Sequence, residues 1–344
     1  MTSVTSPLKS LVESRAATPL VTVIICVYNA GEYFRPSLLS IIEQTYRNLD
    51  IIIIDDGSTD GCFDTVADIL VDRRIRVFHQ DNATKPVAMN RALALAEGEY
   101  YVIHDADDIS HSTRVERQID VMLHHPACAV VFCGHELILN GRRLAPLCEH
   151  KDEQDCAREI SAFQMPAHDP TAMFRLSFVR DMRYDESMQL IETFDYILRV
   201  GERYPVRVLG ECLYSYRILF ASVTRRDPGK RDVAVARALT AAHTRRGIAD
   251  TLLSSTYHVQ RSKNSVADNN LAAHFIRSVL SQRAAGAYWN ALRTGWQCLR
   301  LHPFDPHYYK AIIYALIPRN AVAGARAMAQ RLSLTTSTVT QPGA

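Results

Sequence analysis

Short apolar runs alternate with segments of helical spacing over the first 110 residues. The run from Leu20 to Val27 is continuous and rich in β-branched residues, which is typical of a strand buried on both faces of a parallel sheet. The same reasoning predicts strands at 20–27, 51–54, 75–79 and 101–103, and helices at 33–43, through Val66 and Leu70, and at 85–96, with Gly98 closing the last one. This alternation predicts a doubly wound α/β sheet with helices on its faces.

The remaining two thirds of the chain contain fewer clear strands. The pattern predicts helices at 114–125 and 192–204, strands at 129–133, 206–209 and 213–218, and a flexible polar loop at 140–163. Beyond Arg225, helical periodicity with many Ala and Arg residues occurs at 232–247, 270–283, 286–300 and 307–330. We therefore predict a disordered leader (1–19), an α/β domain (20–225), a basic helical region (226–333) and a disordered tail (334–344).

Charge divides the chain at the same place. From Arg225 onward there are 17 Lys and Arg, five Asp and no Glu, a balance of +12; this leaves −10 for residues 1–224, because the whole chain carries +2. The eight cysteines are scattered without a CxxC pair, which fits a reducing compartment better than a disulfide framework or a zinc site. No stretch resembles a signal peptide or is long enough to span a bilayer, so a cytoplasmic location is expected.

Three carboxylates follow the strand at 101–103, namely Asp105, Asp107 and Asp108. The end of a strand is where an open α/β sheet presents its ligand-binding groups. Carboxylates this close repel one another unless they are protonated, solvated or neutralised by a cation. Oxygen ligands on a loop suit Mg²⁺ or Mn²⁺, whereas the alternative is a solvated acidic turn.

Other nucleotide-binding signatures are missing from the sequence. No GxGxxG follows the first strand and no GxxxxGKS occurs, so dinucleotide-binding and P-loop functions lose their main support. A sugar nucleotidyltransferase, which usually carries a Gly-rich basic loop after its first strand, is a minor alternative because CVYNAGEYF lacks that loop.

Five segments in order resemble the family-two inverting glycosyltransferases of the GT-A fold. They are VTVIICVYNAGEY, DDGSTDG, KPVAMNRALALAEGEYYVIHDADD, HDPTAMFR with the ILRV helix, and YRILFASVTR. The resemblance covers about two thirds of the chain, and it is closest to bacterial cell-surface polysaccharide glycosyltransferases. It implies a GT-A catalytic domain, Rossmann-like with a mostly parallel sheet, and the helical periodicity beyond Arg225 predicts an all-helical region after it.

The resemblance also implies a donor site. Asp107 would ligate a divalent metal, Mn²⁺ or Mg²⁺, and Asp105 would contact the donor ribose or the metal shell. Asp56 matches the position that accepts the N3–H of uracil, although it also fits the cap of a turn. Val27, Tyr28 and Asn29 would meet the nucleotide where the first strand ends, with core packing as the alternative for Tyr28. Lys85 would meet phosphate or ribose, or it is a solvated lysine.

The general base is the weakest match. The family usually has Glu-Asp at the start of the ILRV helix, with Asp as the base, whereas this sequence has Glu192 and Thr193. Thr193 cannot act as a base at neutral pH, so Glu192 serves, or Asp195 serves from the same helix face, or catalysis is lost. We favour Glu192. His168 matches an acceptor-side position, and Arg217 would approach the diphosphate or pair with the acidic domain.

The sequence therefore predicts an inverting glycosyltransferase that moves a sugar from a nucleotide diphosphate sugar, a UDP-sugar above others, to a hydroxyl of a glycan or a lipid-linked acceptor. A nucleotide-sugar-binding protein without turnover is the alternative that Thr193 suggests. The basic C-terminal helices either contact an anionic membrane surface or pack on the acidic domain. Nucleic acid is not an expected partner, because the arginines are spread through apolar helices.

Overall fold

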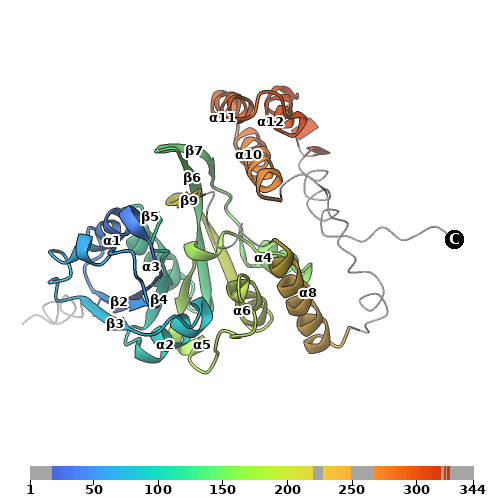
Figure 1. Ribbon diagram of the computed structural model, residues 1–344. Helices are drawn as coiled ribbons and strands as arrows, with labels where there is room; N and C mark the ends of the chain where they lie inside the picture. The colour runs from blue at the N-terminus through green and yellow to red at the C-terminus, as the bar shows by residue number, and fades with distance from the viewer. Residues whose placement is uncertain (1–17, 220–227, 249–265, 319–320, 323, 326–344) are drawn as a thin grey trace, which may run out of the picture.

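A computed structural model of the protein describes residues 18–219, 228–248, 266–318, 321–322 and 324–325 (Figure 1). Almost all of the predicted leader and the whole of the predicted tail lie outside these residues. None of the helices in the described ranges is both long enough and apolar enough to cross a membrane.

The described strands form one nine-stranded sheet in the order β3-β2-β1-β4-β8-β6-β9-β5, with β7 paired to β6. The strands are β1 (Val21–Val27), β2 (Leu49–Asp55), β3 (Ile75–His79), β4 (Tyr100–Ile103), β5 (Ile109–Ser110), β6 (Val130–Leu139), β7 (Arg142–Leu147), β8 (Met173–Arg175) and β9 (Val206–Arg217). β3, β2, β1 and β4 are parallel neighbours, and β8 joins them in the antiparallel direction. The predicted α/β class is confirmed.

Helices cover both faces of this sheet. They are α1 (Phe34–Ile42), α2 (Lys85–Leu95), α3 (Arg114–His124), α4 (Glu153–Ser161), α5 (Leu176–Val179), α6 (Glu192–Gly201), α8 (Pro228–Arg245), α10 (Val266–Ala284), α11 (Tyr288–Leu301) and α12 (Pro306–Leu316), with short 3-10 turns η2 (Gly31–Tyr33), η3 (Asp64–Val66) and η4 (Asp169–Thr171). Ile52 and Ile54 of β2 pack in the cluster that contains residues of α2 and α6. Ile51 and Ile53 pack in the cluster with α1 and α3. Burial on both faces explains the unbroken apolar runs.

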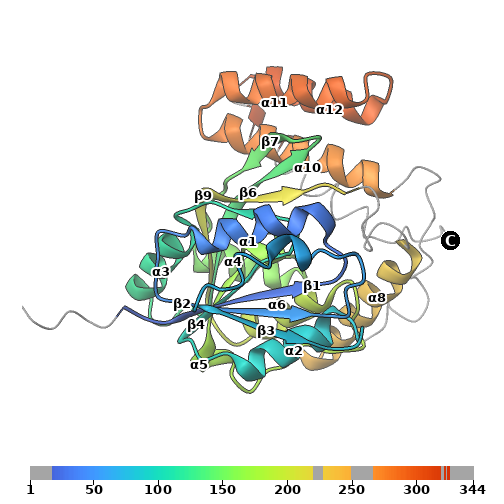
Figure 2. The same cartoon turned by 60° about the vertical axis from the view of Figure 1, so that its left-hand side comes forward.

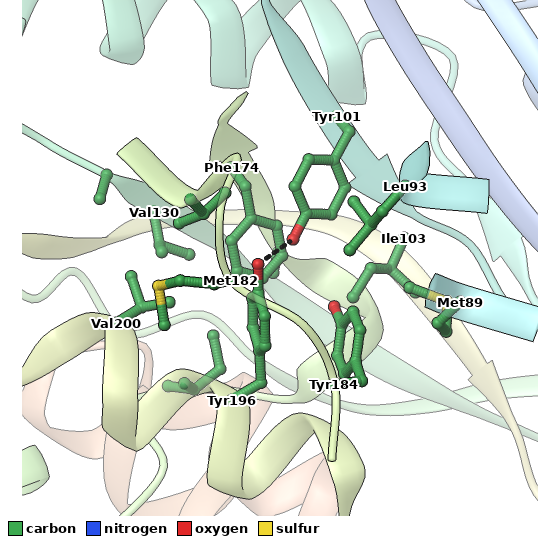
Figure 3. Packing of buried hydrophobic residues seen from close by; sticks show 14 of the residues in the cluster. Met89, Leu93, Tyr101, Ile103, Val130, Phe174, Met182, Tyr184, Tyr196 and Val200 are labelled. Atoms are coloured by element: carbon green, nitrogen blue, oxygen red, sulfur yellow. Dashed lines mark hydrogen bonds between the residues drawn. The ribbon is translucent and has the colours of Figure 1, made fainter. Parts of the chain in front are cut away.

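One of these clusters is rich in aromatic side chains (Figure 3). Tyr101 of β4 stacks on Phe174 of β8 with ring centroids 4.5 Å apart. Tyr184 stacks on Tyr196 of α6 at 4.2 Å, and the Tyr101 and Tyr196 hydroxyls are hydrogen-bonded at 3.4 Å. These contacts pack the middle of α6 against β4.

Three predictions of local structure are wrong. The helix predicted through Val66 and Leu70 is only the 3-10 turn η3. Gly61 has φ +74°, and the Thr65 hydroxyl donates to the Cys62 carbonyl, so local side-chain bonds compete with helix formation. The loop predicted at 140–163 contains β7 and α4. The two strands predicted after residue 205 are one strand, β9, which continues through Gly210.

The C-terminal helices attach at two different places. α8 contacts α6, while α10, α11 and α12 form a helical layer over β7 (Figures 1 and 2). Phe275 and Val279 of α10 are buried in a cluster with Leu137 and Leu139 of β6. In addition, the Ser278 hydroxyl donates to the Pro146 carbonyl of β7 at 2.7 Å. The helical content predicted for this region is confirmed where the structure describes it.

Candidate active site

The candidate site lies where the carboxyl ends of β1, β2 and β4 meet. The chain passes from β1 to β2 on one side and returns to β4 on the other, so these ends flank a switch in strand order. Register places Val27 opposite Asp55 and Ile24 opposite Ile103. Ligands bind at such a point in open α/β sheets because the connecting loops diverge there.

The loop after β1 is tied to the loop after β2. The backbone N–H of Asp56 donates to the Val27 carbonyl at 2.8 Å. Asn29 has φ +51°; its N–H donates to the Ser58 hydroxyl at 3.1 Å, and its side-chain carbonyl accepts from the Thr59 N–H at 2.8 Å. Tyr28 is 49% exposed, so its ring lies outside the core and packing is not its role. Val27 and Asn29 therefore shape the loop, and the Tyr28 ring is free to face a ligand.

Asp56 is buried and holds the loop that precedes α2. Its Oδ1 accepts from the Gln80 side-chain amide at 2.7 Å and the Ala83 N–H at 2.9 Å, and its Oδ2 accepts from the Thr84 N–H at 3.1 Å. A carboxylate offers about four lone-pair positions, so room for one more donor remains. Asp55 accepts from the Ser58 N–H and pairs with His79, so its carboxylate has a structural role.

Lys85 and Asp105 form an ion pair at the end of β4. The Lys85 Nζ lies 2.7 Å from Asp105 Oδ1, and both side chains are partly exposed. Burial lowers the pKa of Lys85, but the carboxylates of Asp105, Glu192 and Asp169 outweigh burial and hold that pKa well above its usual value. Burial raises the pKa of Asp105. The positive charge of Lys85 and its hydrogen bond lower that pKa and outweigh burial, so Asp105 has a pKa below its usual value. Lys85 is therefore a cation among carboxylates, not a solvated lysine.

Asp107 differs from its two acidic neighbours. Burial, and then the charge of Asp105, raise the pKa of Asp107 to about 6. Asp108 is fully buried and accepts from the Arg217 N–H at 2.7 Å. Burial, with Asp107 and Asp105, raises the pKa of Asp108 well above its usual value. Asp108 thus anchors the end of β9 to the acidic cluster.

Arg217 stands beside the same cluster. Its Nε donates to the Asp107 carbonyl at 2.7 Å, and its guanidinium lies 4.6 Å from the centre of the Tyr33 ring. The side chain is partly exposed. Arg217 therefore brings a positive charge next to Asp107 from the far end of the sheet.

The acids of α6 have separate environments. Glu192, in the first turn of α6, is 5% exposed, and its Oε2 has no hydrogen-bond partner among the described residues. Burial raises the pKa of Glu192, and Lys85 partly offsets that effect. Asp195 is also buried, but its Oδ2 pairs with Arg199 at 2.7 Å and its Oδ1 with Arg245 of α8 at 3.3 Å. Glu192 has a carboxylate available for chemistry, whereas that of Asp195 is fully engaged.

His168 belongs to a group of aromatic side chains next to this site. Its ring centroid lies 4.5 Å from Tyr216 and 4.7 Å from His135, and His135 lies 5.0 Å from His274 of α10. Burial lowers the pKa of His168, while Asp169 and Asp105 raise it. The His168 Nε2 is buried without a hydrogen-bond partner in the described part of the chain.

Sequence reasoning missed three residues at the site. Asp169 acts on the pKa of both Lys85 and Glu192, and it stands beside His168 in the HDPT segment that carried the resemblance. The Tyr214 hydroxyl accepts from the Asp105 N–H at 3.2 Å, and His135 contacts His168. No sequence signal marks Tyr214 or His135, because both lie on late strands of ordinary composition.

The acidic pair fits a divalent cation of low protein coordination. No group of three or more His, Cys, Asp or Glu within the described ranges is arranged to hold a metal ion. Mg²⁺, however, is commonly held by one or two carboxylates together with substrate phosphates. Burial and the charge of Asp105 raise the pKa of Asp107, and a bound cation would offset both effects. Asp107 and Asp105 are therefore the candidate ligands for such a cation.

Comparison with known proteins gives a family match over part of the chain. Residues 22–181 match the family described as glycosyl transferase family 2. The matched segment is therefore similar to a family 2 glycosyltransferase domain. This segment includes β1, β2 and β4, and hence Asp56, Lys85, Asp105 and Asp107; Glu192 and Arg217 lie beyond its end.

Two bacterial relatives match part of the chain. TuaG of Bacillus subtilis (strain 168), a glycosyltransferase by name, is 36% identical over 122 residues, which is 35% of this chain and 48% of TuaG. Glycosyltransferase GlyG of Streptococcus pneumoniae serotype 4 is 39% identical over 99 residues, which is 28% of this chain and 33% of GlyG. The chain thus spans less than half the length of these relatives.

Solved structures resemble the chain over most of its length. S. aureus TarS 1–349 in complex with UDP-GlcNAc has a TM-score of 0.54 at 15% identity, and the match covers 94% of this chain and 93% of TarS 1–349. The mannosyltransferase PcManGT from Pyrobaculum calidifontis, in complex with GDP-Man and Mn²⁺, has a TM-score of 0.53 at 17% identity, with 91% and 88% covered. At these identities the likeness establishes the fold, which supports the predicted GT-A class.

Proposed function

We propose that this protein is an inverting glycosyltransferase that moves a sugar from a nucleoside diphosphate sugar, with UDP as the nucleotide, to a hydroxyl of a glycan or a lipid-linked acceptor. The observation that carries the proposal is the pairing of two features beside Lys85. These are the acidic pair Asp105 and Asp107, and the buried carboxylate of Glu192, whose Oε2 has no hydrogen-bond partner among the described residues. The name of TuaG links that relative to teichuronic acid biosynthesis, which favours a cell-surface glycan as the product.

The donor would occupy the ends of β1, β2 and β4. Tyr28, exposed above the loop, offers a ring face for the base, and Asp56 has one acceptor position left for a base N–H. Lys85 and Arg217 supply positive charge near the diphosphate. A divalent cation held by Asp107 and Asp105 would stabilise the negative charge that develops on the leaving diphosphate. The TarS and PcManGT complexes, with UDP-GlcNAc and with GDP-Man and Mn²⁺, support this kind of donor.

Glu192 would act as the general base. Its buried carboxylate takes the proton of the acceptor hydroxyl as the acceptor oxygen forms a bond to the anomeric carbon. The bond from that carbon to the diphosphate oxygen breaks, and its electron pair leaves with the nucleoside diphosphate. A single displacement of this kind inverts the anomeric configuration. Asp195 remains the less favoured base because Arg199 and Arg245 occupy its oxygens.

Calorimetric titration of UDP, with and without Mn²⁺, tests the donor site. We expect UDP binding that depends on Mn²⁺ and that Asp107→Ala abolishes. Asp120→Ala is the matched control, because it removes an exposed carboxylate of α3. If the wild-type protein binds GDP or dTDP instead, the nucleotide is wrong; if it binds none of the three, the proposal fails.

Turnover separates a transferase from a binding protein. Donor hydrolysis or transfer of a UDP-sugar, followed by NMR of the released sugar, would report both activity and anomeric configuration. Metal-dependent UDP binding without any turnover would favour the alternative that Thr193 suggests, a nucleotide-sugar-binding protein. Retention of configuration would contradict the single displacement by Glu192.

A further inference from the structure

The outer side of α11 carries aromatic and basic residues in alternation. Trp289, Arg293, Trp296 and Arg300 are exposed and follow one another at intervals of four, three and four residues, which places them on one side of the helix. Trp289 is 78% exposed and Trp296 is 55% exposed. The opposite side of α11 is buried, and a Cβ added at Gly295 would lie 2.9 Å from the Ile312 Cα of α12. The tryptophans are therefore not needed to hold the helices together.

α12 and the segment before it also leave large apolar side chains exposed. Phe304 is 94% exposed, Ile313 56% and Leu316 59%. Tyr309 and Lys310 are exposed beside them. Tyr308, Ala311 and Ala315 form the buried side of α12, so its apolar packing is complete without the exposed residues. We call the nine exposed residues the aromatic–basic face: Trp289, Arg293, Trp296, Arg300, Phe304, Tyr309, Lys310, Ile313 and Leu316.

Both the position and the charge of this face point outward. α11 and α12 form the outermost layer of the described chain, on the side of α10 away from β1–β4 (Figures 1 and 2). Residues 288–318 contain one acid, Asp305, which is half-buried, so the exposed charges of the face are all positive. Two copies of a face with this charge would repel each other.

We propose that the aromatic–basic face binds the surface of an anionic lipid bilayer. Tryptophan and tyrosine rings are favoured at the level of the lipid headgroups, because one edge is apolar and the other carries a polar N–H or O–H. Arginine and lysine beside them are attracted to anionic headgroups. Exposed aromatic and aliphatic side chains in the same layer supply apolar area for the boundary with the acyl chains. The helices then lie in the plane of the interface.

The sequence supplies a direct probe of this contact. The protein contains two tryptophans, and both are on the aromatic–basic face, so its tryptophan fluorescence reports on this face alone. We expect vesicles of equal parts phosphatidylglycerol and phosphatidylcholine to shift the emission to shorter wavelength, and lipids brominated on their acyl chains to quench it. Pure phosphatidylcholine vesicles should produce a much smaller change, and high salt should weaken the binding.

Variants that keep both tryptophans separate the charged and apolar contributions. Arg293→Gln with Arg300→Gln should weaken partition into phosphatidylglycerol vesicles by about 30-fold, from about fivefold for each basic residue near an anionic surface. Phe304→Ser with Ile313→Ser should weaken it by about tenfold or more. Val71→Ser with Arg73→Gln is the matched control, because it removes one exposed aliphatic and one exposed basic residue of the α/β domain.

Several results would overturn the proposal. An emission spectrum that no vesicle changes would do so, as would equal binding to neutral vesicles, or binding by both test variants that matches the control. A blue shift that grows with protein concentration without lipid, together with a dimer mass in sedimentation, would assign the face to a second copy instead. The inference does not rest on the proposed function, so UDP titration of the same variants should match the wild type and keeps the two questions apart.

Discussion

At the scale of single residues, the acids of the site divide by whether the protein already uses them. Asp56, Asp108 and Asp195 accept hydrogen bonds or ion pairs that hold loops, strands or helices in place. Among the described residues, Glu192 Oε2 and Asp108 Oδ2 are buried without a hydrogen-bond partner, and the pKa values of Asp107 and Asp108 are raised. Keeping charge in such places disfavours folding. Asp108 uses its other oxygen to hold the end of β9, so Glu192 and Asp107 are the residues whose environment is best explained by chemistry with a ligand.

Glu192→Gln should lower sugar transfer by about 10²- to 10⁴-fold, the usual contribution of a general base, while UDP affinity stays the same. The activity of the wild type should rise with pH as Glu192 loses its proton, above the ordinary pKa of a glutamate, because burial raises this pKa. The charged and titratable groups around it are Lys85, Asp169, Asp105, Cys26 and Tyr184. A pH–rate profile and UDP calorimetry measure both effects.

Glu192→Gln should lower transfer activity but raise the stability of the protein at neutral pH. A carboxyl group with a raised pKa in the folded state stabilises the protein below its unfolded pKa, and that contribution is lost as pH rises through the folded pKa. Glu192→Gln should therefore raise the Tm at pH 7 and lose this advantage in acid. Asp195→Asn is the matched control, because it should lower the Tm by breaking ion pairs with Arg199 and Arg245. Full transfer activity in Glu192→Gln would exclude this residue as the base.

The sequence identified most of these positions but not their environments. The sequence points to Asp56, Asp105 and Asp107 because each follows a predicted strand, and both strand ends and clusters of acidic residues can be recognised in a short segment. The spacing of Glu192 and Asp195 places them on one face of a helix. However, Arg245, fifty positions after Asp195, forms an ion pair with the Asp195 carboxylate and so engages it. Contacts between residues so far apart depend on how α8 packs on α6, which no local pattern encodes.

At the scale of elements, residues 140–163 contain a hairpin signal and a helix-cap signal that were missed because the segment is polar. Asn140 and Gly141 have φ +49° and +71° and join β6 to β7 as a two-residue hairpin, the connection that Asn-Gly favours. Asp152 caps α4 by accepting from the Asp155 N–H at 2.8 Å. Charged residues around both features made 140–163 look like a loop. The strands buried on both faces were predicted well because burial demands unbroken apolar runs.

Gly98 makes a testable contribution to the sheet. A Cβ at this position would lie 2.6 Å from the Tyr100 carbonyl oxygen and 2.7 Å from the Thr22 backbone nitrogen, so Gly98 permits close approach and does not close α2 through a left-handed turn. Gly98→Ala should lower the free energy of unfolding by about 2 kcal/mol, because backbone atoms of β1 and β4 must move. Urea denaturation measures this change.

Gly324→Ala is a suitable comparison, since a Cβ there meets nothing within 4 Å. Its free energy of unfolding should stay within about 0.5 kcal/mol of the wild type. Equal stability of the Gly98 and Gly324 variants would show that β1 and β4 absorb the extra methyl group.

At the scale of the whole molecule, the positive charge of the C-terminal region pairs with the acidic α/β domain at the end of α8. Arg245, the last residue of α8, and Arg246, which follows it, pair with Glu202, and Arg245 also pairs with Asp195. This part of the basic region therefore packs on the acidic domain, one of the two roles predicted from the sequence. In the part of the chain that the structure describes, no ion pair joins the exposed charges of α11 and α12 to the acidic domain, and the membrane surface is the role that we have proposed for them.

The α10–α12 layer is held to the sheet through β6 and β7 rather than through the candidate site. Phe275 of α10 is fully buried against Leu137 and Leu139 of β6 and Leu144 of β7. Phe275→Ala should destabilise this contact by about 3 to 5 kcal/mol. Hydrogen exchange should then accelerate in α10–α12 and β7, while β1, β2 and β4 keep their protection and UDP affinity is unchanged. Leu123→Ala, at an exposed position of α3, should leave exchange unaltered throughout.

The result would also test a connection between the two regions. The rings of His168, His135 and His274 form a line from the candidate site to α10, with centroids 4.7 and 5.0 Å apart. If Phe275→Ala loosens α10 and transfer to the acceptor falls while UDP binding persists, this line of rings couples the helical layer to the acceptor side. If hydrogen exchange rises only in α10–α12 and transfer is unchanged, sugar transfer does not depend on the α10–α12 layer. Loss of UDP binding would show that the donor site depends on the α10–α12 layer, which contradicts the prediction that the two are independent.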